Sequence, residues 1–152
     1  MTDFMKEAIK EAIKAKEADE VPIGAVVVCD GKIISRAFNQ REKKQNALAH
    51  AEVLAINKAC KKLGSWRLDN ATIYVTLEPC PMCAGAITNA RIKEVVYGCE
   101  EATSKDNLCQ KIFESDRLNH HPAYTFDQTH KQEITQLLQQ FFKEKRQKQS
   151  KK

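Results

Sequence analysis

Residues 71–90 read Ala-Thr-Ile-Tyr-Val-Thr-Leu-Glu-Pro-Cys-Pro-Met-Cys-Ala-Gly-Ala-Ile-Thr-Asn-Ala, and this stretch decides the fold. Its first part, Ala71 to Leu77, is rich in β-branched residues and predicts a strand. A proline-rich turn follows, and Met82 to Ala90 predicts a short helix. A strand that turns directly into a helix is typical of domains in which helices cover a sheet.

The rest of the chain alternates between strands and helices in the same way. Ile23–Cys29 is a continuous apolar run, Asp30-Gly31 is a strong hairpin signal, and Lys32–Phe38 is the returning strand. Lys93–Tyr97 predicts a fourth strand and Asn39–Asn46 a loop, and apolar residues at helical spacing predict helices at Asp3–Ala18, Ala49–Lys62, Lys105–Glu114 and Thr129–Arg146. We therefore expect an α/β fold, a three-layer α/β/α domain with a mixed central sheet.

Length and composition indicate one globular domain. The 152 residues are enough for a single domain with a real core, and 42% of them are hydrophobic. The N-terminal residues lack the apolar stretch of a signal peptide, and no segment is long enough to span a bilayer. We therefore expect a cytoplasmic protein, whose six cysteines are reduced and serve as metal ligands or buried side chains.

The excess positive charge lies at the C-terminus. The net charge is +5, and the last ten residues hold six basic side chains against the single acidic Glu144. We therefore divide the chain into a domain at residues 1–142 and a basic tail at residues 143–152. The tail suits a polyanionic partner, and a solvated helix end fits its composition equally well. Phe141 and Phe142 are expected to pack the last helix onto the sheet.

Two short segments carry the chemistry. His50-Ala51-Glu52 stands at the start of a predicted helix, and Pro79-Cys80-Pro81-Met82-Cys83 lies where a strand turns into a helix. Zinc with three protein ligands keeps its fourth tetrahedral position for water, which is the arrangement of a catalytic site. The set His50, Cys80 and Cys83 therefore predicts one catalytic zinc ion per chain.

Glu52 is the expected acid–base group. Residues two apart on a helix do not share a face, so His50 and Glu52 reach one site only where that site caps the helix end. The partial positive charge at a helix N-terminus favours a cysteine thiolate and a neutral histidine. Together with Pro-Cys-x-x-Cys, the His-x-Glu spacing is the signature of zinc-dependent nucleobase deaminases, whose glutamate transfers protons and is not a ligand.

Other interpretations of these residues need different partners. A redox Cys-x-x-Cys needs no histidine, and a structural zinc site needs a fourth ligand that no second Cys-x-x-Cys supplies. Cys29 and Cys60 are expected to pack in the core, whereas no role is assigned to Cys99 and Cys109. His120-His121 offers a second metal site, but a surface or packing role is the commoner one for such a pair.

From Val21 onward the chain resembles the tRNA-specific adenosine deaminases, which convert the wobble adenosine of tRNA to inosine. The matching segments are Val21–Val26, Phe38-Asn39, His50–Val53, Gly64–Leu68, Tyr74–Ala86, Ala90–Ile92, Val95–Gly98, Arg117–His120 and Phe141–Lys143. The zinc motifs belong to the whole cytidine deaminase-like superfamily. The Asn39 loop and the Phe-Phe-basic ending are closer to the tRNA enzymes.

The resemblance implies a cytidine deaminase-like fold with a zinc site whose ligands are His50, Cys80 and Cys83. It implies Glu52 as the proton donor and Asn39 as a hydrogen-bonding contact to the target nucleoside. It also implies a homodimer that binds a tRNA anticodon stem-loop near the subunit interface. The RNA contacts expected in the basic tail are Lys143, Lys145 and Arg146.

One segment departs from the family. Where its members usually carry an Asp, a Lys and a glycine-rich run, residues 99–108 read Cys-Glu-Glu-Ala-Thr-Ser-Lys-Asp-Asn-Leu. Glycines let a backbone pass close to a ligand, and two glutamates facing RNA would repel phosphate.

Three hypotheses follow from these features: a tRNA wobble-adenosine deaminase, a deaminase of a free base or nucleoside of the guanine or cytosine type, and an inactive zinc protein that binds RNA or serves as a partner subunit. The basic tail favours the first, since a small neutral base needs no electrostatic guide. The intact Glu52 argues against the third.

Overall fold

Five strands form one mixed sheet in the order β2-β1-β3-β4-β5 in the computed structural model, which describes residues 2–101 and 108–150. Three of them run parallel to one another, namely β3 (Ala71–Val75), β4 (Glu94–Tyr97) and β5 (Ala123–Phe126). The remaining pair is a hairpin, in which β1 (Gly24–Cys29) is antiparallel both to β2 (Lys32–Phe38) and to β3. Because β1 lies inside the sheet with helices on both faces, all but its last residue are buried, which explains its unbroken apolar run.

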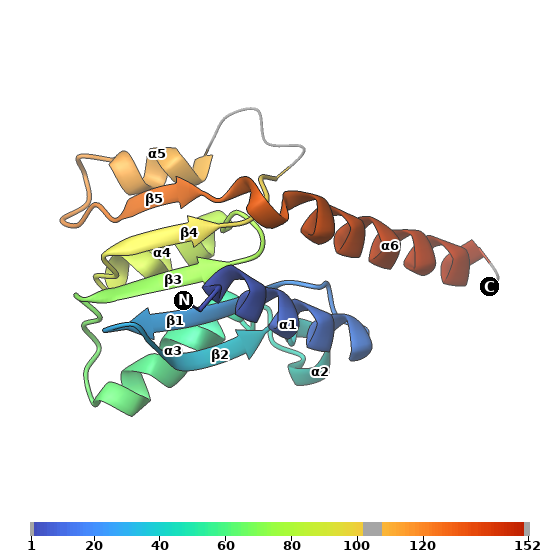
Figure 1. Ribbon diagram of the computed structural model, residues 1–152, viewed down its shortest axis with the longest axis horizontal. Helices are drawn as coiled ribbons and strands as arrows, with labels where there is room; N and C mark the ends of the chain where they lie inside the picture. The colour runs from blue at the N-terminus through green and yellow to red at the C-terminus, as the bar shows by residue number, and fades with distance from the viewer. Residues whose placement is uncertain (1, 102–107, 151–152) are drawn as a thin grey trace.

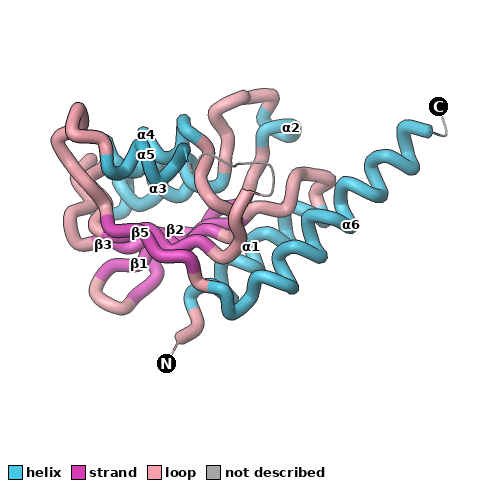
Figure 2. The backbone as a smooth tube through the Cα atoms, turned by 90° about the horizontal axis from the view of Figure 1, so that it is seen from above, coloured by secondary structure: helices cyan, strands magenta, loops and turns pink. Residues whose placement is uncertain are grey.

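Helices cover both faces of the sheet (Figures 1 and 2). On one face lie α1 (Phe4–Glu17) and α6 (Lys131–Ser150), and on the other lie α3 (Ala51–Leu63), α4 (Pro81–Asn89) and α5 (Leu108–Glu114). Two shorter pieces are α2 (Arg41–Lys44) and a 3-10 turn, η1 (Gln128–His130), that leads into α6. The expected three-layer α/β/α fold with a mixed sheet is therefore confirmed. None of the described helices is both long and apolar enough to cross a membrane.

Each helical layer packs on the sheet through its own apolar cluster. The larger cluster lies between the sheet and α3, α4 and α5, and it includes buried Cys109 and half-buried Cys60. The smaller one joins α1 and α6 to β4, and it contains Met5, Ala8, Ile9, Val96, Cys99 and Ile134. Cys29 is half-buried at the end of β1, so the expected packing role applies more fully to Cys60.

The predicted hairpin turn forms where the sequence placed it, and local caps close the ends of two helices. The Asp3 carboxylate accepts the Lys6 backbone N–H at 3.1 Å and so caps α1. Asp30 and Gly31 both have positive φ, at 52° and 75°, as the predicted two-residue hairpin requires. Gly64 ends α3 in the left-handed conformation with φ at 64°.

Two elements were missed. β5 has only four residues and alternates between exposed and half-buried, and its pairing with β4 is what makes it a strand. α2 lies in a segment predicted as a loop, and its first turn is capped from a distance by buried Glu20, whose two carboxylate oxygens accept the N–H groups of Glu42 and Lys43 at 3.0 and 2.8 Å. Neither strand pairing nor a remote cap is visible in a local pattern.

The end of α6 differs from the predicted helix boundary. α6 continues to Ser150, so the residues assigned to a separate tail are, as far as residue 150, the last turns of the same helix. The expected start of α5 at residues 105–107 lies outside the described residues.

The contact between α1 and β1 predicts the effect of a single added methyl group. A Cβ at Gly24 would lie 2.2 Å from the Ala8 carbonyl oxygen and 2.5 Å from the Ala12 nitrogen, both backbone atoms that cannot rotate away. We expect Gly24→Ala to lower the free energy of unfolding by about 1–3 kcal/mol or more, measured by urea denaturation. Gly85→Ala is the matched control, because its Cβ meets nothing within 4 Å and alanine favours a helix. Equal stability of the two variants would contradict this account.

Candidate metal centre

The site lies where two helices begin at the same edge of the sheet. α4 follows β3 directly, and parallel strands joined through helices place the helix N-termini on one side of the sheet. His50 is the N-cap residue of α3, and Cys80 is the N-cap residue of α4. Two residues that are 30 positions apart in the chain are thereby brought together at two helix starts.

Both N-cap side chains are free to face each other. Each residue has extended backbone geometry, and neither side chain makes a capping hydrogen bond to its own helix. His50 Nδ1 lies 3.7 Å from Cys80 Sγ and 3.6 Å from Cys83 Sγ. Pro81, which has no N–H to donate, occupies the first turn of α4, where helical N–H groups lack partners anyway.

These distances match what one tetrahedral zinc ion requires. The three ligand atoms lie within 4.8 Å of one another, and they are the metal-ligand group found among the described residues. Zn–N and Zn–S bonds of about 2.0 and 2.3 Å at a tetrahedral angle separate the two ligand atoms by about 3.5 Å. The predicted ligands His50, Cys80 and Cys83 therefore form a group that fits a metal with one position left open.

The environment of Cys80 favours the form that binds metal. The hydrogen bond from the Cys83 thiol, together with backbone N–H groups of α4, lowers the pKa of Cys80 to about 5. A thiolate is the form of cysteine that coordinates metal, so Cys80 is prepared for this role at neutral pH.

Glu52 lies beside this group in the first turn of α3. Its side chain is only 4% exposed and hydrogen-bonds with the Cys83 thiol. Burial, assisted by the nearby Cys80, raises the pKa of Glu52 to about 7. A carboxyl group with a pKa near neutrality can both accept and donate a proton, which is what a general acid–base group must do. His50 and Glu52 share one site because that site lies beyond the helix end.

His50 and Glu52 border a cleft of about 860 Å³, within the usual size range of small-molecule sites. Asn39 lines the same cleft and is 6% exposed. Its side-chain oxygen accepts the Arg41 N–H at 3.2 Å, and its side-chain nitrogen donates to the Val21 carbonyl at 3.5 Å. These two bonds fix the orientation of the amide.

The outer walls of the cleft combine residues that the sequence analysis named, which are Glu100, Glu101, Phe142 and Arg146, with others that it did not single out. One wall carries the carboxylates Glu78, Glu100 and Glu101. The lining also includes Arg41 and one side of α6, with Lys131, Thr135, Leu138, Gln139, Phe142 and Arg146. Spacings of three or four residues along α6 were visible in the sequence, but nothing there indicated which part of the molecule this side would face.

The tail residues occupy different positions. Arg146 lines both the main cleft and an adjoining cavity of about 290 Å³. Lys145 forms an ion pair with Asp19 at 3.1 Å, and Lys143 is exposed. The expectation for the two phenylalanines was half wrong: Phe141 is 5% exposed, but Phe142 is 45% exposed and lines the cleft.

The His120-His121 pair has a packing role. His120 Nε2 lies 2.6 Å from the Ile92 carbonyl oxygen, and His121 Nδ1 lies 3.0 Å from that of Phe113. Both rings thus tie the segment before β5 to neighbouring elements. In the part of the chain that the structure describes, neither ring belongs to a group able to hold a metal.

Known proteins match this chain over nearly its full length. The model of the MafB19-like deaminase family matches residues 1–146. The tRNA-specific adenosine deaminase of Bacillus subtilis (strain 168) is 49% identical over 146 residues, which cover 95% of this chain and 90% of that protein. That of Agrobacterium fabrum is 43% identical over 145 residues, which cover 95% of both proteins.

Solved structures share the architecture. One, from a study of A-to-I editing by tRNA:A34 deaminases at the wobble position of transfer RNA, is 39% identical with a TM-score of 0.83, and the match covers 91% of this chain and all of the other. A guanine deaminase of Bacillus subtilis is 37% identical with a TM-score of 0.64, over 92% of this chain and 95% of that one. The chain belongs to the MafB19-like deaminase family and, within it, to the tRNA-specific adenosine deaminases.

Proposed function

We propose that this protein is a zinc-dependent hydrolase that deaminates adenosine to inosine at the wobble position of tRNA. The observation that carries the proposal is the group of three ligands, His50, Cys80 and Cys83, next to a buried carboxyl group in a cleft. The relatives named tRNA-specific adenosine deaminase support the substrate.

The chemistry divides between the metal and Glu52. A zinc ion held by the three ligands would supply water whose pKa is lowered to about 7. Glu52 would take a proton from that water and deliver it to the ring nitrogen of adenine as the water oxygen bonds to the carbon that carries the amino group. It would then take the second proton, from the hydroxyl group so formed, and pass it to the amino group, which leaves as ammonia. The pKa of about 7 at Glu52 suits these successive transfers.

Asn39 is the proposed contact to the target nucleoside. Its amide lines the cleft, and its two polar atoms hydrogen-bond to Arg41 and to Val21. The oxygen has a second lone pair and the nitrogen a second hydrogen, and both can serve a ligand. Because the existing bonds hold the amide in place, little entropy is lost when a nucleoside binds.

RNA would enter along the basic side of the cleft. Arg41 and Arg146 line both the main cleft and the adjoining cavity, so they mark where the two meet. Arginine side chains suit phosphate, whereas Glu78, Glu100 and Glu101 on the other wall would repel it. A wobble base is in an exposed loop and can be turned out of its stack at low cost, which lets it reach the metal site.

Location and assembly complete the proposal. A tRNA substrate supports a cytoplasmic protein. The chain also exposes large apolar side chains, among them Leu48 at 58%, Leu63 at 46% and Trp66 at 60%, and such surface supports the homodimer that the family resemblance implies.

The substrate is tested with purified, zinc-loaded protein. It is incubated with an anticodon stem-loop that carries wobble adenosine, with the same stem-loop carrying adenosine one position away, and with free adenosine, cytidine, cytosine and guanine. We expect inosine only from the first RNA, measured by nuclease digestion and mass spectrometry. Conversion of guanine or cytosine without conversion of RNA would support the free-base alternative, and RNA binding without turnover would support the inactive zinc protein.

Two substitutions distinguish the role of the metal from the role of the acid–base group. Glu52→Gln should keep about one zinc per chain, because the residue acts on the water, and should lower the turnover rate by about 10²–10⁴-fold. Cys83→Ser should lose zinc and turnover together. Zinc is measured by elemental analysis of the purified variants, and a loss of zinc from Glu52→Gln would mean that Glu52 is a ligand.

The RNA path is tested by two variants of α6 that remove the same charge. Arg146→Gln removes a side chain that lines the cleft, whereas Lys148→Gln removes an exposed one that does not. We expect Arg146→Gln to weaken stem-loop binding and to reduce the slope of log affinity against log salt by about 0.7, the value for one phosphate contact on a single strand. Equal effects of both substitutions would show that only the overall charge of α6 matters.

A further inference from the structure

α1 and α6 lie side by side on one face of the sheet and run in the same direction (Figures 1 and 2). Three polar contacts join them or the residues next to their ends: His130 with Asp3, Glu133 with Lys6, and Lys145 with Asp19. The partners are 127, 127 and 126 positions apart in the sequence. This nearly constant separation means that the two helices keep one register over the whole length of α1.

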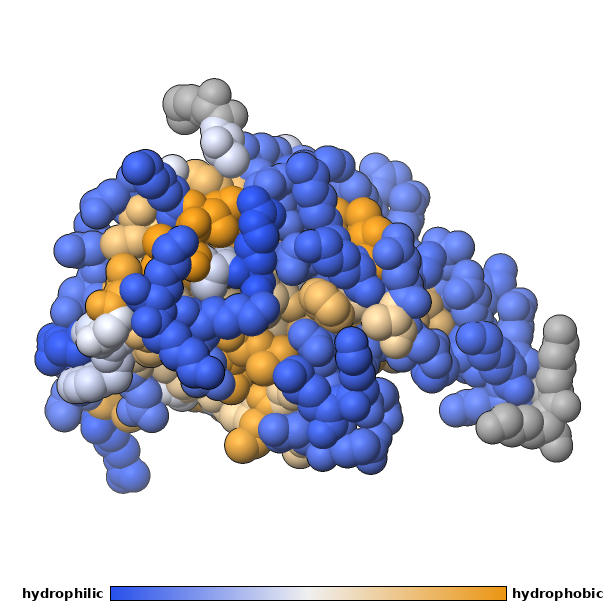
Figure 3. Space-filling model, turned by 90° about the horizontal axis from the view of Figure 1, so that it is seen from below, coloured by the Kyte–Doolittle hydropathy of each residue, from blue (hydrophilic) through white to orange (hydrophobic). Residues whose placement is uncertain are grey.

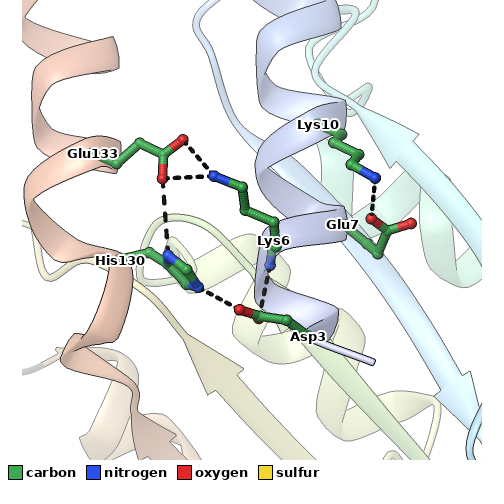
Figure 4. A network of polar contacts seen from close by, with 6 residues as sticks. All are labelled: Asp3, Lys6, Glu7, Lys10, His130 and Glu133. Carbon is green, nitrogen blue, oxygen red and sulfur yellow. Dashed lines mark hydrogen bonds and ion pairs between the residues drawn. The ribbon is translucent and has the colours of Figure 1, made fainter. Parts of the chain in front are cut away.

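At the beginning of the helices the contacts form a network (Figure 4). The Asp3 carboxylate caps α1 through the Lys6 N–H and lies 2.7 Å from His130 Nε2. The Lys6 ammonium donates to both carboxylate oxygens of Glu133, at 3.0 and 3.1 Å. His130 Nδ1 is also 3.8 Å from Glu133, so the four side chains form one connected group.

Just beyond this network an apolar contact determines how closely α6 packs on the sheet. Ile134 is 1% exposed and packs in the same cluster as Met5 and Ile9. A Cβ at Gly98 would lie 2.5 Å from the Ile134 side chain, so the helix sits directly on the backbone after β4.

Fewer interactions hold the second half of α6 to the rest of the domain. It extends beyond the sheet, and its surface is almost entirely hydrophilic where it leaves the body of the molecule (Figures 2 and 3). Phe141 is the large buried apolar side chain in this half. The Lys145 ammonium lies 5.8 Å from the Phe141 ring centre and 3.1 Å from the carboxylate of Asp19, which follows α1.

The side of α6 that does not contact α1 is a wall of the catalytic cleft. Phe142 and Arg146 come from the second half of α6, and they line the cleft together with Val21 and Asn39. Because those residues belong to the sheet edge and its loops, the width of the cleft depends on where α6 lies along α1.

We propose that the polar contacts between α1 and α6 are a positioning clamp. The clamp holds Phe142 and Arg146 in the positions that give the cleft the width that RNA requires. The inference rests on the proposed function and adds residues that do not touch the substrate. Exposed ion pairs contribute little to global stability, so the clamp acts on the position of α6 and not on whether the domain folds.

Lys6→Glu and Lys10→Glu form the main comparison. Both place the same charge change on α1, but Lys6 faces Glu133 on α6 whereas Lys10 pairs with Glu7 inside α1. Lys6→Glu should raise KM for the stem-loop roughly three- to fivefold with kcat unchanged, and it should speed amide hydrogen exchange at residues 139–149. Lys10→Glu should change neither. The double variant Lys6→Glu/Glu133→Lys restores opposite charges and should recover both values.

Asp19→Asn tests the contact at the other end of α1, because the clamp and a purely electrostatic role predict opposite changes in KM. Asp19 lines the outer cavity, so removing its negative charge should strengthen phosphate binding if its role is only electrostatic. The clamp predicts the reverse, a higher KM together with faster exchange in the last turns of α6.

Hydrogen exchange needs no substrate, so it judges the clamp even if the protein does not act on tRNA. Absence of turnover on the stem-loop would remove the proposed function. Unchanged hydrogen exchange in Lys6→Glu, or a lower KM in Asp19→Asn, would contradict the clamp.

Discussion

The site depends on two helices that begin at the same edge of one sheet. The N-cap positions of α3 and α4 are occupied by a histidine and a cysteine whose side chains do not cap their own helices. Their ligand atoms therefore face each other across the gap between the helix ends, at separations close to the edge of a zinc tetrahedron. The hydrogen bond from Cys83 and the backbone N–H groups at the start of α4 also favour the thiolate of Cys80, so the charge of this ligand is prepared as well as its position.

The same arrangement supports the proposal that Glu52 acts on the water and not on the metal. It lies in the first turn of α3, close enough to hydrogen-bond with Cys83, but the ligand group is complete without it. Its burial keeps the neutral and ionised forms of the carboxyl group nearly equal in free energy at neutral pH. Metal binding and proton transfer are thus assigned to different residues by one helix terminus.

Specificity is built from other parts of the molecule. The chain has the architecture of a guanine deaminase as well as of a tRNA:A34 deaminase, so the fold and metal site alone do not select the base. Selection would depend on the cleft walls, with carboxylates on one side and Arg41, Phe142 and Arg146 on the other. The proposed clamp between α6 and α1 would link substrate recognition to a helix interface far from the metal in sequence.

The sequence alone predicted the candidate metal ligands and Glu52, and it determined the hairpin and the alternation of strands and helices, because each depends on residue types at short fixed spacing. It did not reveal β5, which needs β4 to pair with, or α2, whose N–H groups are capped by Glu20. It also placed Phe142 in the core, although the side chain lies in the cleft. Whether a residue of α6 faces the sheet, α1 or the cleft depends on how the helix packs against segments more than one hundred positions away. Only the tertiary structure decides this, because a helical repeat shows which residues share a side but not what that side contacts.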